Sequence, residues 1–142
     1  MEKNMTCTFF GHRDAPDGIK TSLRNTLIEL IESRSVDKFY VGNEGAFDRM
    51  VQCELRLMKK EYPFIDYEIV LAYMPQGNEG LENTVFPENA AVCPRRFAID
   101  RRNRWMIDRS DFAVVYAVRS IGGASKFAKI ARVRGLTVIE IM

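Results

Sequence analysis

The sequence lacks the residue patterns that mark common metal sites and extracellular scaffolds. Its 142 residues contain one histidine and three cysteines, which are Cys7, Cys53 and Cys93. A single histidine excludes a multi-histidine metal site, and cysteines without a Cys-x-x-Cys spacing give no zinc signature. We therefore expect no bound metal. An odd, widely scattered set of cysteines is typical of reduced thiols in the cytosol.

Long hydrophobic runs are also missing. The N-terminus, MEKNMTCTFF, has no apolar core of the kind found in signal peptides, and no uninterrupted apolar run approaches the length of a membrane span. The net charge is only +2, which is too small to indicate nucleic-acid binding by itself. We therefore expect a cytoplasmic protein without a membrane partner, and we do not expect a nucleic acid as its ligand.

Strand-like and helix-like patterns alternate along the chain. The apolar periods predict strands at 6–10, 37–42, 67–73, 112–118 and 136–141, and helices at 17–34, 45–62, 95–111 and 122–135. Segment 74–94, with three prolines, predicts a long loop. This order indicates an α/β fold in one domain over residues 1–142. We expect a doubly wound, mainly parallel, five-stranded sheet with helices on both faces, which is Rossmann-like.

Glycines and polar residues follow the predicted strands, at the edge where sheets of this kind bind ligands. Glycine lets the backbone approach a ligand closely, and free N–H groups at helix starts favour an anion such as phosphate. The predicted ligand-binding residues are Gly11, His12, Arg13, Gly42, Asn43, Glu44, Gly45, Arg102, Arg119, Ser120, Gly122 and Gly123.

Simpler explanations of these residues stay open at this point. Gly11 and Gly42 can be ordinary strand-to-loop turns. Neither belongs to a GxGxxG or GxxxxGK[ST] motif, so the standard dinucleotide and P-loop motifs lack support. His12 can be a general base, a phosphate donor or a structural hydrogen-bonding group. The arginine-rich segment 95–111 can be a solvated helix face.

Four motifs, in this order, resemble the YpsA-like branch of the SLOG superfamily, which is named for Smf/DprA and the LOG proteins. The motifs are FFGHRD, GNEGAFD, RRNRWMIDRSDFAVVY and GGASKFAKIA. The similarity spans nearly the whole chain. It implies a Rossmann-like domain that binds nucleotides or nucleotide-derived ligands. It also implies that apolar helix faces can form a homodimer, as is common among such proteins.

The related LOG phosphoribohydrolases cleave the N-glycosidic bond of nucleoside monophosphates, and the chain departs from their pattern. Lys129 falls where that pattern has its catalytic glutamate. A lysine cannot stabilise the positive oxocarbenium character that develops in this reaction. LOG-type hydrolysis through this position is therefore not expected. The acid–base candidates that remain are His12, Asp14 and Glu44, and Asp48 is a further acid that can substitute.

Three functions are consistent with these residues. The preferred hypothesis is a cytosolic binding domain or sensor for a nucleotide or nucleotide-derived ligand, such as ADP-ribose, an NAD-type molecule or a nucleoside phosphate. No cofactor is assigned beyond that ligand. The first alternative is a nucleotide-processing hydrolase, phosphoribohydrolase-like, with diverged catalytic residues. The second alternative is a DNA-associated protein similar to DprA, and only the arginine-rich helix supports it.

Overall fold

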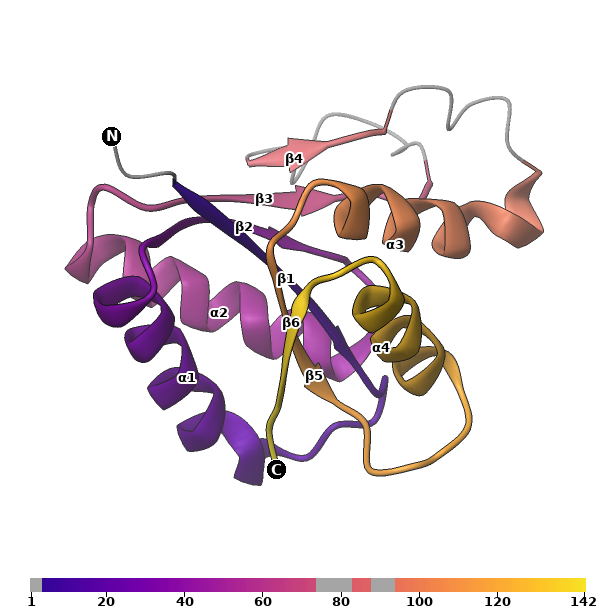
Figure 1. Cartoon of the computed structure of the whole chain (residues 1–142), viewed down its shortest axis with the longest axis horizontal. Helices are drawn as coiled ribbons and strands as arrows, with labels where there is room; N and C mark the ends of the chain where they lie inside the picture. The colour runs from indigo at the N-terminus through magenta and orange to yellow at the C-terminus, as the bar shows by residue number, and fades with distance from the viewer. Residues whose placement is uncertain (1–3, 74–82, 88–93) are drawn as a thin grey trace.

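A parallel sheet forms the centre of the molecule (Figure 1). The computed structural model describes residues 4–73, 83–87 and 94–142. The strands in these ranges are β1 (Met5–Gly11), β2 (Val36–Val41), β3 (Asp66–Val70), β4 (Thr84–Val85), β5 (Phe112–Tyr116) and β6 (Thr137–Glu140). Their spatial order is β4-β3-β2-β1-β5-β6, and each neighbouring pair is parallel.

The predicted α/β, Rossmann-like class is confirmed, with six strands in the described ranges instead of the five expected. The additional strand is β4, which lies in the segment 74–94 that the sequence predicts to be a loop. Its two residues pair with Ile69 and Val70 of β3. Two residues are too few to show the alternation of polar and apolar positions that marks a strand in a sequence. Most of the same segment lies outside the described residues.

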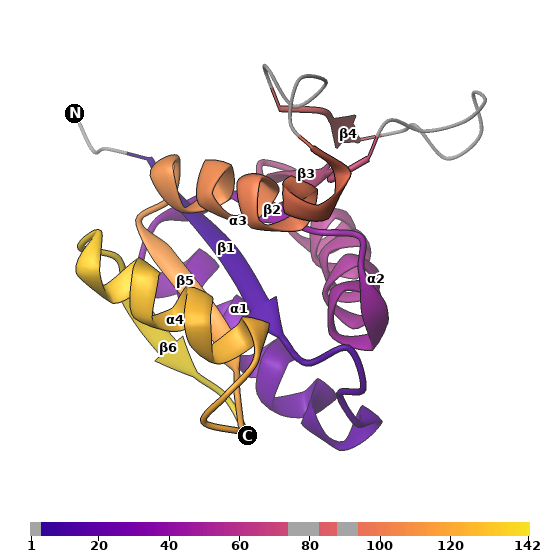
Figure 2. The ribbon, with the colours of Figure 1, turned by 90° about the vertical axis from the view of Figure 1, so that its right-hand side faces the viewer.

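The helices cover both faces of the sheet (Figure 2). In the described ranges they are α1 (Lys20–Ser33), α2 (Gly45–Glu61), α3 (Ala98–Asp108) and α4 (Gly123–Val133), with short 3-10 turns before α1 (Asp17–Ile19) and α3 (Arg95–Phe97). The helices α1 and α2 pack on one face, and α3 and α4 pack on the other. None of these helices combines the length and apolar character needed to cross a membrane.

Strand β1 supplies side chains to two separate hydrophobic cores. Phe9 packs with Leu23 of α1 and Leu55 of α2, whereas Phe10 packs with Met106 of α3 and Phe127 of α4. Because helices cover both faces, every residue of β5 is buried, as expected for an inner parallel strand. The strand predicted at 112–118 is therefore confirmed as β5, which ends two residues earlier than predicted.

The strand order creates a switch point beside β1. The chain runs outward from β1 through β2 and β3 to β4, and it then returns to place β5 on the other side of β1. In doubly wound sheets the crevice for a ligand lies outside the carboxyl ends of the strands at such a point. Here that edge carries the residues that follow β1, β2 and β5.

The exit of β1 is packed too tightly for any side chain at Gly11. A Cβ at this position would lie 2.2 Å from the Phe47 ring of α2. A second close approach lies beside it, because a Cβ on Gly45 would be 2.7 Å from the Cα of Arg13. The Ala46 N–H also donates a hydrogen bond to the Arg13 carbonyl, with 2.7 Å between N and O. The start of α2 is thus fixed against the segment that leaves β1.

We predict that Gly11→Ala lowers the free energy of unfolding by roughly 1–3 kcal/mol, because the added methyl group overpacks the buried Phe47 ring. Gly18→Ala is the control, since no atom lies within 4 Å of its Cβ position, and we expect it to change stability by no more than about 0.5 kcal/mol. Urea unfolding followed by circular dichroism measures both. Equal stability of the two variants would contradict the close contact at Gly11.

Candidate functional site

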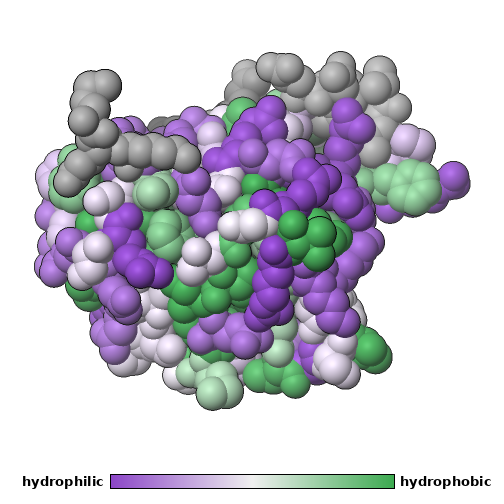
Figure 3. All heavy atoms as spheres, in the orientation of Figure 1, coloured by the Kyte–Doolittle hydropathy of each residue, from purple (hydrophilic) through white to green (hydrophobic). Residues whose placement is uncertain are grey.

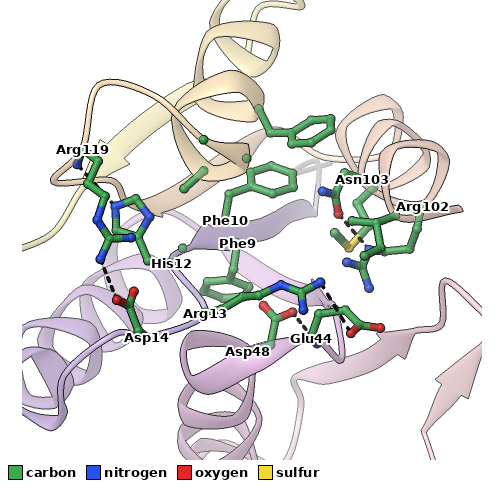
Figure 4. Close-up of a pocket in the computed structure, with 18 of the residues that line it drawn as sticks. Phe9, Phe10, His12, Arg13, Asp14, Glu44, Asp48, Arg102, Asn103 and Arg119 are labelled. Carbon is green, nitrogen blue, oxygen red and sulfur yellow. Dashed lines mark hydrogen bonds and ion pairs between the residues drawn. The ribbon is translucent and has the colours of Figure 1, made fainter. Parts of the chain in front are cut away.

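A cavity of about 390 Å³ opens at the carboxyl edge of the sheet (Figure 4). Its walls come from the end of β1, the β2–α2 loop, the first turn of α2, one face of α3 and the start of α4. Nine of the twelve predicted ligand-binding residues line it, and these are Gly11, His12, Arg13, Gly42, Glu44, Arg102, Arg119, Gly122 and Gly123. Their role in binding a ligand stays a prediction.

Three predicted ligand-binding residues do not line the cavity. Asn43 is exposed, and its side-chain oxygen accepts a hydrogen bond from Gln52 Nε2 at 3.2 Å. Gly45 instead lets the start of α2 pack closely against the backbone of Arg13. Ser120 is exposed and lines a separate depression between α4 and the carboxyl ends of β5 and β6, together with Lys129. The side chain at the position of the LOG glutamate therefore lies outside the main cavity.

The floor of the cavity is apolar, and the sequence gives no signal for it. Phe10 stacks on Phe127, with 5.6 Å between ring centroids and 26° between ring planes. Ile99 and Met106 of α3 and the exposed Ile121 add to this lining. Apolar residues of this kind are indistinguishable from ordinary core residues in a sequence. Phe10 and Phe127 are largely buried, so the floor presents a small apolar patch to the cavity.

Arg102 is the buried cation of the cavity, with only 3% of its surface exposed. Its Nε donates to Asn103 Oδ1 at 2.8 Å, and its Nη1 donates to the Val70 carbonyl at 3.2 Å. Among the described residues no carboxylate lies within ion-pair distance of this guanidinium. Burial lowers the pKa of Arg102, while the charges of Asp48 and Glu44 raise it. An arginine keeps its charge in proteins, so a buried positive charge faces the cavity.

Asp48 is the buried acid of the cavity. Its Oδ2 accepts a hydrogen bond from the Glu44 N–H at 2.9 Å, at the first turn of α2. Burial raises the pKa of Asp48 to about 6, although the nearby charge of Arg102 and this hydrogen bond lower it. Asp48 lies in the first turn of α2, directly after the loop that follows β2, and this position at the carboxyl edge of the sheet is the signal that could have placed it at the cavity.

Gly42 allows Arg102 and Asp48 to approach the same point. A Cβ on Gly42 would lie 2.7 Å from Arg102 Nη1 and 2.7 Å from Asp48 Oδ2. Both contacts are shorter than any that a real Cβ makes, so a side chain here would displace one charged group or both. Gly42 is therefore more than a strand-to-loop turn.

His12 is held on the opposite side of the cavity from Arg102 (Figure 4). Its Nε2 accepts a hydrogen bond from the Arg119 backbone N–H at 3.4 Å, and its ring meets the Tyr116 ring edge-on. The Arg119 side chain pairs with Asp14 at 2.6 Å. Burial and the charge of Arg119 lower the pKa of His12, against a smaller opposite effect of Asp14. His12 is thus a neutral acceptor near pH 7, and Asp14 belongs to the same wall.

The starts of α2 and α4 differ in what they can offer an anion. At α2 the Glu44 N–H already donates to Asp48, and the Ala46 N–H donates to the Arg13 carbonyl. At α4 both Gly122, with φ of +109°, and Gly123 have no atom within 4 Å of the Cβ position. Of these two helix starts, α4 is therefore the more accessible to an anion.

All four motifs quoted above contribute residues to this cavity: FFGHRD, GNEGAFD, RRNRWMIDRSDFAVVY and GGASKFAKIA. Comparison with models of protein families found no match, and comparison with curated proteins found no significant one. Within residues 4–73, 83–87 and 94–142, no group of three or more His, Cys, Asp or Glu side chains is placed to hold a metal ion.

We predict a pH-dependent difference in stability between the wild type and Asp48→Asn. The folded pKa of about 6 lies above the ordinary value of 3.8, so the folded protein retains a proton that the unfolded chain loses. This contribution favours folding at acid pH and is lost as the pH rises through about 6. Relative to the wild type, the variant should gain up to about 3 kcal/mol between about pH 4 and pH 8.

Urea unfolding at several pH values measures this difference. Asparagine can still accept the Glu44 N–H, so the helix cap is preserved in the variant. A stability difference that is the same at every pH would show that Asp48 ionises as an ordinary exposed acid does.

Proposed function

We propose that this protein is a cytoplasmic binding domain or sensor whose cavity holds a nucleotide or nucleotide-derived ligand. The observation that carries the proposal is Arg102, a buried cation without an ion-pair partner among the described residues, beside an apolar floor of Phe10 and Phe127. A buried charge of this kind is costly unless it is paired. A ligand that joins an anion to a planar ring matches both parts of the cavity.

The parts of such a ligand can be assigned to parts of the cavity. The start of α4 at Gly122 and Gly123 and the guanidinium of Arg102 or Arg13 favour phosphate, through N–H groups and charge-assisted hydrogen bonds. Glu44 is half-buried and can accept hydrogen bonds from ribose hydroxyl groups. The base would pack against the apolar floor. ADP-ribose, NAD-type molecules and nucleoside phosphates all contain these three parts.

The resemblance to the YpsA-like branch of the SLOG superfamily belongs to this proposal. Its support is that four motifs far apart in the sequence converge on one cavity. The homodimer also stays a proposal. Figure 3 shows apolar residues in the centre of one face, between α1 and α4, where the edge strand β6 lies. Such a face offers a surface for self-association.

We predict that Arg102→Gln weakens binding of ADP-ribose, AMP or inorganic phosphate by at least about tenfold, because it removes a buried charge-assisted hydrogen bond. Arg101→Gln is the matched control, since Arg101 is exposed on the same helix and does not line the cavity. Isothermal titration calorimetry measures the affinities, and circular dichroism checks that both variants fold. Arg102→Lys, which keeps the charge, should bind better than Arg102→Gln.

Two results would count against this function. One is the absence of binding by every nucleotide-derived probe and by phosphate. The other is an equal loss of affinity in the Arg101 and Arg102 variants. That result would indicate non-specific attraction by surface charge instead of a specific anion site in the cavity.

A second candidate function is a nucleotide-processing hydrolase. The observation in its favour is that the carboxyl groups of Asp14, Glu44 and Asp48 line the same cavity as His12. A buried acid with a raised pKa can serve as a general acid or base. Lys129, at the position of the LOG glutamate, has no part in this arrangement because it lies outside the cavity.

For this second candidate we predict release of free base from a nucleoside monophosphate, detected by liquid chromatography. Glu44→Gln and Asp48→Asn should each lower the rate by about 100-fold or more if the side chain acts as the acid or base. Lys129→Gln is the control and should leave the rate unchanged. Binding of the nucleoside monophosphate without any release of base would contradict the hydrolase function and support only the binding function.

A further inference from the structure

Asp48 is the charged group of the cavity that ligand binding leaves unexplained. A carboxylate beside an anion site repels the anion, yet Asp48 is buried at the point where Arg102 also arrives. Its hydrogen bond from the Glu44 N–H caps the first turn of α2, but an asparagine would serve that role as well. The buried acid therefore needs a reason beyond helix capping.

Three charged side chains face Asp48 from the elements packed around it. Arg102 comes from α3, Arg13 comes from the segment after β1, and Glu44 precedes α2. Neither arginine forms an ion pair with Asp48 among the described residues. Arg13 lies 3.9 Å from Glu44 instead, and both of these side chains are partly exposed to solvent. The main charge that Asp48 can offset inside the cavity is thus that of Arg102.

We propose that Asp48 is a proton switch that sets the anion affinity of the cavity. As a carboxylate, Asp48 offsets the charge of Arg102 across Gly42 and weakens anion binding. When a proton from solvent neutralises the carboxylate, the charge of Arg102 is left for the ligand. The inference rests on the proposed binding function, because it concerns the same cavity, and it adds a regulation that the binding function does not require.

Linkage gives the proposal a second, independent readout. If protonation of Asp48 strengthens anion binding, then anion binding must raise the affinity of Asp48 for a proton by the same factor. The protein should therefore take up a proton when the ligand binds near neutral pH. Burial already raises the pKa of Asp48 to about 6, so a modest further increase brings the change into the range above pH 6.

His12 is another titratable group of the cavity, and its effect on anion binding must be separated from that of Asp48. A protonated His12 would also attract an anion. Burial and the charge of Arg119 lower the pKa of His12, however, and its Nε2 accepts a hydrogen bond that protonation would break. His12→Asn therefore tests whether the pH response belongs to the histidine or to Asp48.

The experiment measures the affinity for ADP-ribose by calorimetry at about pH 5.5, 6.5 and 8, in two buffers of different ionisation enthalpy. The diphosphate of this probe keeps its charge over that range, so a change in affinity reports on the protein. We expect binding about tenfold tighter at the acid end, because one negative charge is removed near the anion. The two buffers should also reveal uptake of a proton above pH 6.

In Asp48→Asn we expect affinity close to the acid value of the wild type at every pH, with no proton uptake. In His12→Asn the ratio between acid and alkaline affinity should persist. Equal wild-type affinity at all three pH values, or a pH response that survives in Asp48→Asn, would overturn this inference alone and leave the binding function standing. Binding at no pH would overturn the binding function and this inference together.

Discussion

Close packing between the exit of β1 and the start of α2 is the constraint on which the site depends. The Ala46 N–H reaches the Arg13 carbonyl at 2.7 Å, and neither Gly11 nor Gly45 has room for a side chain. These contacts fix the His12–Asp14 wall relative to the Glu44–Asp48 wall before any ligand arrives. Binding groups that are placed in advance lose little conformational freedom on binding, which is the benefit of preorganisation.

Much of the fold could be predicted because apolar residues recur at regular spacings along its helices and strands. Leu23, Leu27 and Leu30 mark the buried face of α1, and the continuous apolar run of β5 marks an inner parallel strand. Strand β4 could not be predicted, because its two residues, Thr84 and Val85, are too few to show an alternation of polar and apolar positions. Its place is decided by pairing with β3, which is a tertiary contact.

The candidate site was predictable to the extent that topology alone decides it. Parallel strands bring their carboxyl ends to one edge, so residues after β1, β2 and β5 were expected to meet there. The apolar floor could not be predicted, because Phe10 and Phe127 look like any other core residues. The direction of a helix was also not enough to predict whether its N–H groups are free to bind an anion. The start of α2 carries the expected glycine, but the N–H groups of Glu44 and Ala46 are already bonded to Asp48 and Arg13, and only the packed structure reveals this.

The stacked pair of Phe10 and Phe127 belongs both to the cavity and to the hydrophobic core between the sheet and α3–α4. Under the proposed binding function, recognition and folding would therefore draw on the same side chains in this half of the molecule. Substitutions that reshape the floor for another ligand would also disturb core packing, so evolutionary drift in specificity is restrained here. Ile121 also lines the cavity but is exposed in the loop before α4 and lies outside this core, so it is the easier position for related proteins to vary.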